Sequence, residues 1–187
     1  MMGPAEKIEI RNSRLIEECL RSSLGSFRQM FGEGVMDVEA HEFIQSSIMA
    51  QACLKQLHLN GVAVVLTLSG CLSGTFRLVL NEAAARQLVA ALVGEVPRKG
   101  SFSDMARSAL KEVANVIASA FLVALERWCG SGGMPGLPEL YLDSRTSEDS
   151  NENTGSTIYG LSLNLGGRPG DRGNAGIFIA LNSGFAR

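Results

Sequence analysis

Histidine is scarce in this chain of 187 residues, which contains only His41 and His58. The four cysteines are scattered along the sequence and form no C-x-x-C pair. Together, these residues give no spacing typical of a zinc site, so we expect no metal site of the protein's own. Reduced thiols in a cytoplasmic protein are the simplest interpretation of this cysteine pattern.

Basic clusters and long apolar runs are also missing. The formal net charge is −2, and no lysine- and arginine-rich cluster with interleaved aromatic residues occurs, which argues against a nucleic-acid partner. The longest apolar run, around residues 118–124, is far shorter than the roughly 20 residues of a membrane-spanning helix. The first residues include no apolar segment of the signal-peptide kind. We therefore expect no membrane contact.

The remaining composition fits a globular protein. Hydrophobic residues make up 45% of the chain and charged residues 19%, and the length is sufficient for one sizeable core. We predict a single domain over residues 1–187, with residues 1–12 as an N-terminal extension. Residues 144–155 are polar and lack apolar anchors, so we expect a mobile surface loop there.

Apolar residues at helical spacing predict three helices, over residues 13–31, 82–93 and 101–128. Ser13 is a candidate N-cap for the first helix, and Asn81 for the second. Ser101, with Asp104 three residues later, resembles a capping box at the start of the third. Glycines follow each helix, as expected for helix ends.

Strand patterns occur between and after these helices. Residues 61–80 contain two β-branched, apolar runs around SGCLSG, which predicts a hairpin. Further strands are indicated at residues 137–142, 157–165 and 175–181, and polar residues alternate with apolar ones in the second of these. Residues 35–60 fit either a helix or, in their first part, a short strand. The predicted fold class is α+β, an antiparallel sheet with long helices packed on it.

The third helix is apolar almost all the way round. At 3.6 residues per turn, Ser108, Glu112, Asn115 and Ser119 fall within an arc of roughly 60°. We call these four residues the polar seam. A solvated helix face is usually broader and more highly charged, so a narrow seam with one carboxylate and one carboxamide indicates a functional surface.

The seam has the spacing Ser108-x3-Glu112-x2-Asn115-x22-Pro138. This pattern resembles the signature of the CheC/CheX/FliY phosphatases of bacterial chemotaxis. The hairpin followed by a short helix over residues 68–95 also resembles that family, and residues 14–32 resemble the opening helix of CheX. The four positions and three gaps together are more specific than a bare Glu-x-x-Asn.

The resemblance implies hydrolysis of the aspartyl phosphate of a CheY-like receiver domain. Asn115 would orient the attacking water, and Glu112 would dock against a receiver lysine. The receiver would carry the Mg²⁺, so no cofactor of the protein's own is implied. Ser108, Ser119 and Lys111 are candidate binding residues. Pro138 is expected to fix the backbone at the start of a strand.

One departure from CheC concerns the first helix, which lacks a second Glu-x-x-Asn. A single site per chain resembles CheX, a dimer in the family. Two other hypotheses remain open at this point. One is a non-catalytic adaptor or flagellar-switch-like module with the same fold, and the other is an unrelated α+β domain that matches by chance. A solvated stripe is the alternative for the seam itself.

Overall fold

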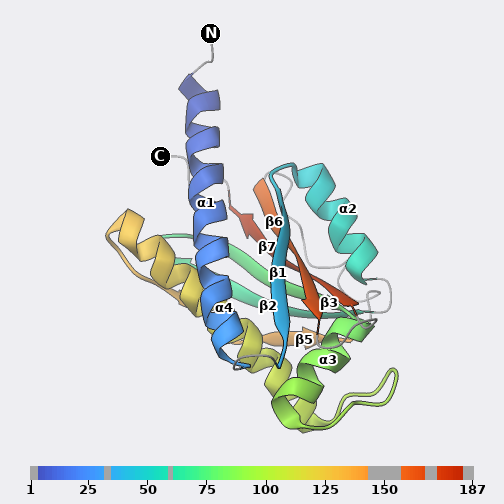
Figure 1. Ribbon diagram of the computed structural model, residues 1–187. Helices are drawn as coiled ribbons and strands as arrows, with labels where there is room; N and C mark the ends of the chain where they lie inside the picture. The colour runs from blue at the N-terminus through green and yellow to red at the C-terminus, as the bar shows by residue number, and fades with distance from the viewer. Residues whose placement is uncertain (1–3, 32–34, 59–60, 143–156, 167–171, 183–187) are drawn as a thin grey trace.

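The computed structural model describes residues 4–31, 35–58, 61–142, 157–166 and 172–182 (Figure 1). In these residues, antiparallel strands form one sheet in the order β1-β6-β7-β3-β2-β4, and β5 also pairs with β2. The helices are α1 (Pro4–Gln29), α2 (Ser47–His58), α3 (Glu82–Val93) and α4 (Asp104–Cys129). The strands are β1 (Asp37–Ile44), β2 (Gly61–Gly70), β3 (Gly74–Asn81), β4 (Gly133–Pro135), β5 (Glu139–Tyr141), β6 (Thr157–Gly166) and β7 (Arg172–Leu181). The α+β prediction is confirmed.

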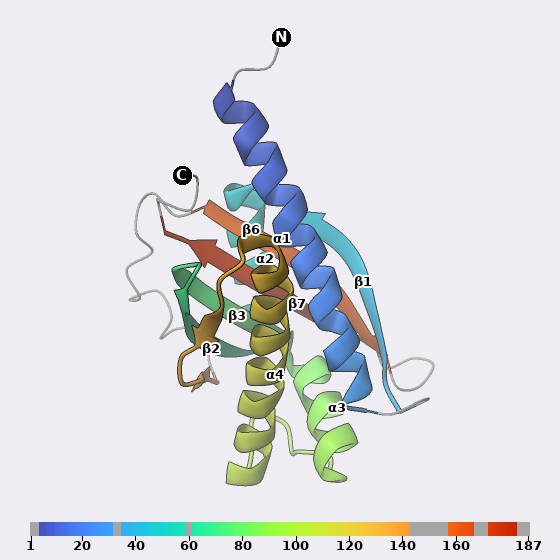
Figure 2. The same cartoon turned by 90° about the vertical axis from the view of Figure 1, so that its left-hand side faces the viewer.

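Helices cover both faces of the sheet. α1, α3 and α4 lie on one face, and Figure 2 shows α1 and α4 side by side in roughly opposite directions. The main hydrophobic core lies between this helix layer and the sheet. α2 covers the other face with a smaller core, in which Leu54 and Leu57 meet Val79 and Phe178 of the sheet.

Alternation along the strands explains the two cores. In β6, Leu161, Leu163 and Leu165 belong to the main core, whereas Ile158 faces α2. The predicted hairpin is confirmed as β2 and β3, which pair in register from Gly61 opposite Asn81 to Leu68 opposite Gly74. Because successive side chains of a strand point to opposite faces, each central strand contributes to both layers.

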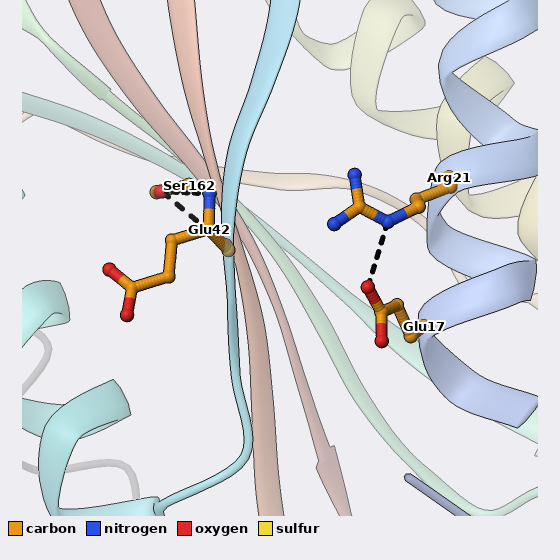
Figure 3. A network of polar contacts seen from close by, with 4 residues as sticks. All are labelled: Glu17, Arg21, Glu42 and Ser162. Atoms are coloured by element: carbon orange, nitrogen blue, oxygen red, sulfur yellow. Dashed lines mark hydrogen bonds and ion pairs between the residues drawn. The ribbon is translucent and has the colours of Figure 1, made fainter. Parts of the chain in front are cut away.

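Residues 35–60, for which the sequence pattern fitted either a helix or a strand, contain a strand followed by a helix. β1 pairs with β6, more than 100 residues further along the chain, and the register shifts between Ala40 and Phe43. At this bulge, the Glu42 amide donates to the Ser162 hydroxyl over 3.0 Å, a contact drawn in Figure 3. α2 then turns back over the sheet.

Two predicted helix starts are wrong. α1 begins at Pro4, so Ser13 lies within the helix, 3% exposed, and does not cap it. α4 is capped by Ser103, whose hydroxyl accepts from the Ala106 amide over 3.2 Å, and not by Ser101. In both cases a nearby serine fitted the local pattern, but a serine ahead of an apolar helical pattern does not by itself mark the first residue of a helix.

The other predicted boundaries agree more closely. The Asn81 carboxamide accepts from the Ala84 amide over 2.8 Å, as expected of an N-cap. α4 ends at Gly130, whose φ of 68° is the left-handed conformation that favours glycine. The strand expected at 137–142 is shorter, over Glu139–Tyr141, and β4 precedes it. Residues 32 and 34 and the loop 144–155 lie outside the described residues.

By length and composition, α4 is also a candidate membrane span among the described helices. Half of its apolar window is buried inside the fold, however. The polar seam interrupts the window, so no unbroken apolar run reaches the length expected of a span. A core helix with one polar face has these same properties.

Candidate functional site

The polar seam lies on the outward face of α4. The inward face packs on the sheet and α1 through ten buried residues: Ala106, Leu110, Val113, Ala114, Ile117, Ala118, Phe121, Leu122, Ala124 and Leu125. Ser108 and Glu112 are exposed, and Asn115 and Ser119 are half-buried. The four predicted residues therefore share one solvent-facing surface, held by a rigid, well-packed helix.

Glu112 and Asn115 are available to another molecule. They are one turn apart on the same face of α4. Within the described parts of the chain, neither side chain forms a hydrogen bond or an ion pair. The carboxylate can only accept hydrogen bonds, whereas the carboxamide can both accept and donate. Such a pair can bind a cation through Glu112 while Asn115 holds a water or an anion.

A groove runs along the α1-facing flank of the seam. Its volume is about 390 Å³, and it is lined by Ser22 and Ser26 of α1 and by Asn115, Val116, Ser119, Ala120, Val123, Ala124 and Arg127 of α4. We call this the α1–α4 groove. Asn115 and Ser119 belong to both the seam and the groove, so a molecule that reaches Asn115 also meets the lining of the groove.

The other candidate residues lie outside this groove. Lys111 is half-buried and, at about 100° of rotation per residue, lies on the opposite flank of the seam. Arg107, a further basic neighbour, donates from Nε to the Phe102 carbonyl oxygen over 3.0 Å at the start of α4. Pro138 lies between β4 and β5, directly before β5 begins.

From Ser13 onwards, where the sequence predicted the first helix, α1 presents no second seam. Since α1 begins at Pro4, it also includes Glu9-x2-Asn12, which lies before the predicted helix. Glu17 forms an ion pair with Arg21, with 2.8 Å between Oε1 and Nε, and Figure 3 shows this pair on α1. Leu20, three residues after Glu17, is fully buried in the core, and Arg21 occupies the position three residues after Glu18. α1 thus contributes the wall of the groove, whereas Glu112 and Asn115 both come from α4.

Cys19 and Cys71 are not activated nucleophiles. All four cysteines lie in described residues and are free, with Cys19 buried and Cys129 exposed. Burial, with smaller effects from Cys129 and Glu18, raises the pKa of Cys19 to about 12. Burial likewise raises the pKa of Cys71. Thiols with raised pKa values stay protonated at neutral pH and are poor nucleophiles.

Sequence patterns missed the α1 half of the groove. Ser22 and Ser26 are spaced by four residues and could have indicated a polar strip on the first helix. On α4, Asn115, Ser119, Val123 and Arg127 also recur every four residues, and all four line the groove. That repeat extends the seam towards the C-terminal end of the helix.

Comparisons with solved structures show the same fold in chemotaxis and flagellar proteins. CheX in a CheX–CheY–BeF3–Mg²⁺ complex from Borrelia burgdorferi is 21% identical, with a TM-score of 0.64, and the match covers 90% of this chain and 97% of that one. A chemotactic CheC-like protein from Shewanella oneidensis is 15% identical, with a TM-score of 0.66 and coverage of 91% and 99%. A FliM–SpeE complex from H. pylori contains a chain 14% identical, with a TM-score of 0.65 and coverage of 92% and 88%.

A family-level match identifies the chain more closely. No curated protein sequence matches it. The model of the family described as chemotaxis phosphatase CheX matches residues 62–158, just over half of the chain. These residues include the hairpin β2–β3, α3, and α4 with its entire polar seam. The chain therefore belongs to the CheX family of chemotaxis phosphatases.

Proposed function

We propose that this protein hydrolyses the aspartyl phosphate of a CheY-like receiver domain. The observation that carries the proposal is the pair Glu112 and Asn115 in a chain of the CheX family. Both face outward on α4, and neither side chain has a partner among the described residues. The related CheX from Borrelia burgdorferi forms a complex with CheY, BeF3 and Mg²⁺, which supports a receiver as the partner. We place the Mg²⁺ with that receiver and assign no cofactor to this chain.

Asn115 is the residue that we assign to the attacking water. An acyl phosphate is reactive, so catalysis needs mainly a water held in line with the phosphorus and stabilisation of developing charge. The Asn115 carboxamide can accept a proton of the water and donate to a phosphoryl oxygen, and it adds no negative charge beside the phosphate. Attack breaks the bond between phosphorus and the aspartyl oxygen, which releases inorganic phosphate and the free carboxylate.

Glu112 is assigned to docking. It is exposed one turn before Asn115, where its carboxylate can pair with a lysine at the edge of the receiver's site. Ser108 can hydrogen-bond within the seam, Ser119 lines its end, and Lys111 can attract an acidic receiver from the opposite flank. Pro138 is assigned a structural role before β5.

The direct test is the lifetime of receiver phosphate. Adding this protein in catalytic amounts to a phosphorylated CheY-type receiver from the same organism should shorten that lifetime severalfold or more. Phosphate release is measured with the receiver in excess, and receiver alone serves as the control. An unchanged lifetime with measurable binding would favour the second candidate, a non-catalytic adaptor or flagellar-switch-like module, which the FliM-like fold supports.

We also propose a homodimer, because the full signature from Ser108 to Pro138 occurs once in the chain, which resembles CheX rather than CheC. β1 is at the end of the strand order, so its outer edge has no strand partner among the described residues. Sedimentation equilibrium at micromolar concentrations should give twice the mass of the chain. A monomer across that range would exclude the dimer and leave the seam unaffected. The receiver partner and free thiols support a cytoplasmic location.

A further inference from the structure

The seam alone is too small to bind a protein. Even weak, transient protein complexes usually bury about 1,000 Å² or more of total surface, far beyond what two side chains provide. A receiver bound at Glu112 and Asn115 must therefore also cover neighbouring surface. The two flanks of the seam differ, since Lys111 lies on one and the α1–α4 groove is hollowed into the other.

The groove is suited to protein contact. Most of its lining is small or weakly polar, including Ser22 and Ser26 of α1 and Ala120 of α4, and Val123 is 53% exposed beside them. Low charge is typical of the centre of a protein interface. The lining is continuous with Asn115, so a partner seated there is adjacent to the proposed catalytic residue.

A positively charged side chain, that of Arg127, lies at the end of the groove away from Asn115. Arg127 is exposed in the last turn of α4, twelve residues and about 18 Å along the helix from Asn115. In the described part of the chain, no carboxylate or carbonyl pairs with its guanidinium. The rest of the lining carries no formal charge. Arginine is enriched among the residues that contribute most to protein interfaces, and its planar group can bind a carboxylate through two hydrogen bonds.

We propose that the α1–α4 groove is a second contact surface for the receiver, with Arg127 pairing with a carboxylate on that partner. This inference rests on the proposed function, because the receiver is the occupant to which it commits. The groove is continuous with Asn115, so a receiver whose phosphate reaches Asn115 also covers the groove, and a carboxylate on its surface about 18 Å from the phosphate would meet Arg127. Arg127 is thus a recognition residue, whereas Asn115 acts on the water.

Receiver affinity tests the role of Arg127 independently of whether the protein hydrolyses the phosphate. The probe is a CheY-type receiver from the same organism, loaded with beryllofluoride and Mg²⁺, and titrated by calorimetry. Arg127→Ala should raise Kd about tenfold, and Arg127→Glu should raise it further. Arg127→Lys keeps the charge but not the two parallel hydrogen bonds, so its Kd should fall between those of wild type and Arg127→Ala. In turnover, Arg127→Ala should raise KM by a similar factor with kcat within about twofold of wild type, and the salt dependence of KM should weaken.

Arg21→Ala is the matched control, because Arg21 is exposed on α1, is paired with Glu17 and does not line the groove. An exposed pair of this kind contributes little, so its removal should leave Kd and KM unchanged. A wild-type Kd for Arg127→Ala would overturn the role of Arg127, whether or not turnover changes. If Arg127 merely stabilises the end of α4, Arg127→Ala lowers the unfolding midpoint and leaves Kd unchanged. Failure of the wild-type protein to shorten the phosphate lifetime would instead refute the proposed function, and the binding titration would still decide the role of Arg127.

Discussion

Replacing Asn115 with alanine should lower the maximal rate of receiver dephosphorylation about 100-fold or more, which is typical for loss of a positioning group. The amide is the group that we assign to the water, and methyl-sized alanine can neither accept from that water nor donate to a phosphoryl oxygen. Asn115 is half-buried on a surface groove, so the fold should tolerate this truncation. The measurement is kcat from phosphate release with excess phosphorylated receiver.

Two further variants sharpen the result for Asn115. Asn115→Asp is nearly isosteric but places negative charge beside the phosphate, so it should also be severely impaired. Asn174→Ala removes an exposed carboxamide on β7, away from α4, and should keep the wild-type rate. Circular dichroism should show the same helix content in all three. Full activity of Asn115→Ala would rule out its role with the water.

Replacing Glu112 with alanine should weaken receiver binding by roughly 10- to 100-fold, the range expected when a charged hydrogen bond is lost. Glu112 is exposed on α4, so its removal leaves no buried group unsatisfied. Affinity for the beryllofluoride-loaded receiver is the appropriate measurement. Glu112→Gln, which retains hydrogen bonding without charge, should fall between wild type and alanine.

Glu95→Ala provides the matched control for Glu112. Glu95 is exposed after α3 and lines neither the seam nor the groove, so its loss should not change affinity. A docking role for Glu112 requires that saturating receiver restores most of the rate of Glu112→Ala. If its kcat stays as low as that of Asn115→Ala at saturation, Glu112 takes part in the chemical step and our assignment is wrong.

Local patterns predicted the elements whose apolar residues fit either the helical or the strand spacing, but not both. The hairpin β2–β3, α3 with its Asn81 cap, and α4 are of this kind. The seam was visible for the same reason, because a narrow polar arc stands out on an otherwise apolar helix. The spacing to Pro138 then made the resemblance to the CheC/CheX/FliY phosphatases specific.

Features that depend on distant contacts were missed. The first part of residues 35–60 fits both helical and strand spacing. Pairing with β6 makes this part a strand, β1. The groove needs α1 and α4 side by side, so Ser22 and Ser26 had no visible link to Asn115 in the sequence. Arg127 was likewise an ordinary basic residue near a helix end until the groove placed it beside the seam.

Asn115 and Glu112 have different roles on α4: Asn115 acts on the water, and Glu112 binds the partner. Single-turnover dephosphorylation, with this protein varied in excess over phosphorylated receiver, separates the two roles in one measurement. Our account predicts that Asn115→Ala lowers the plateau rate without shifting the half-saturating concentration, and that Glu112→Ala shifts the half-saturating concentration with the plateau largely retained. A wild-type plateau for Asn115→Ala would contradict it.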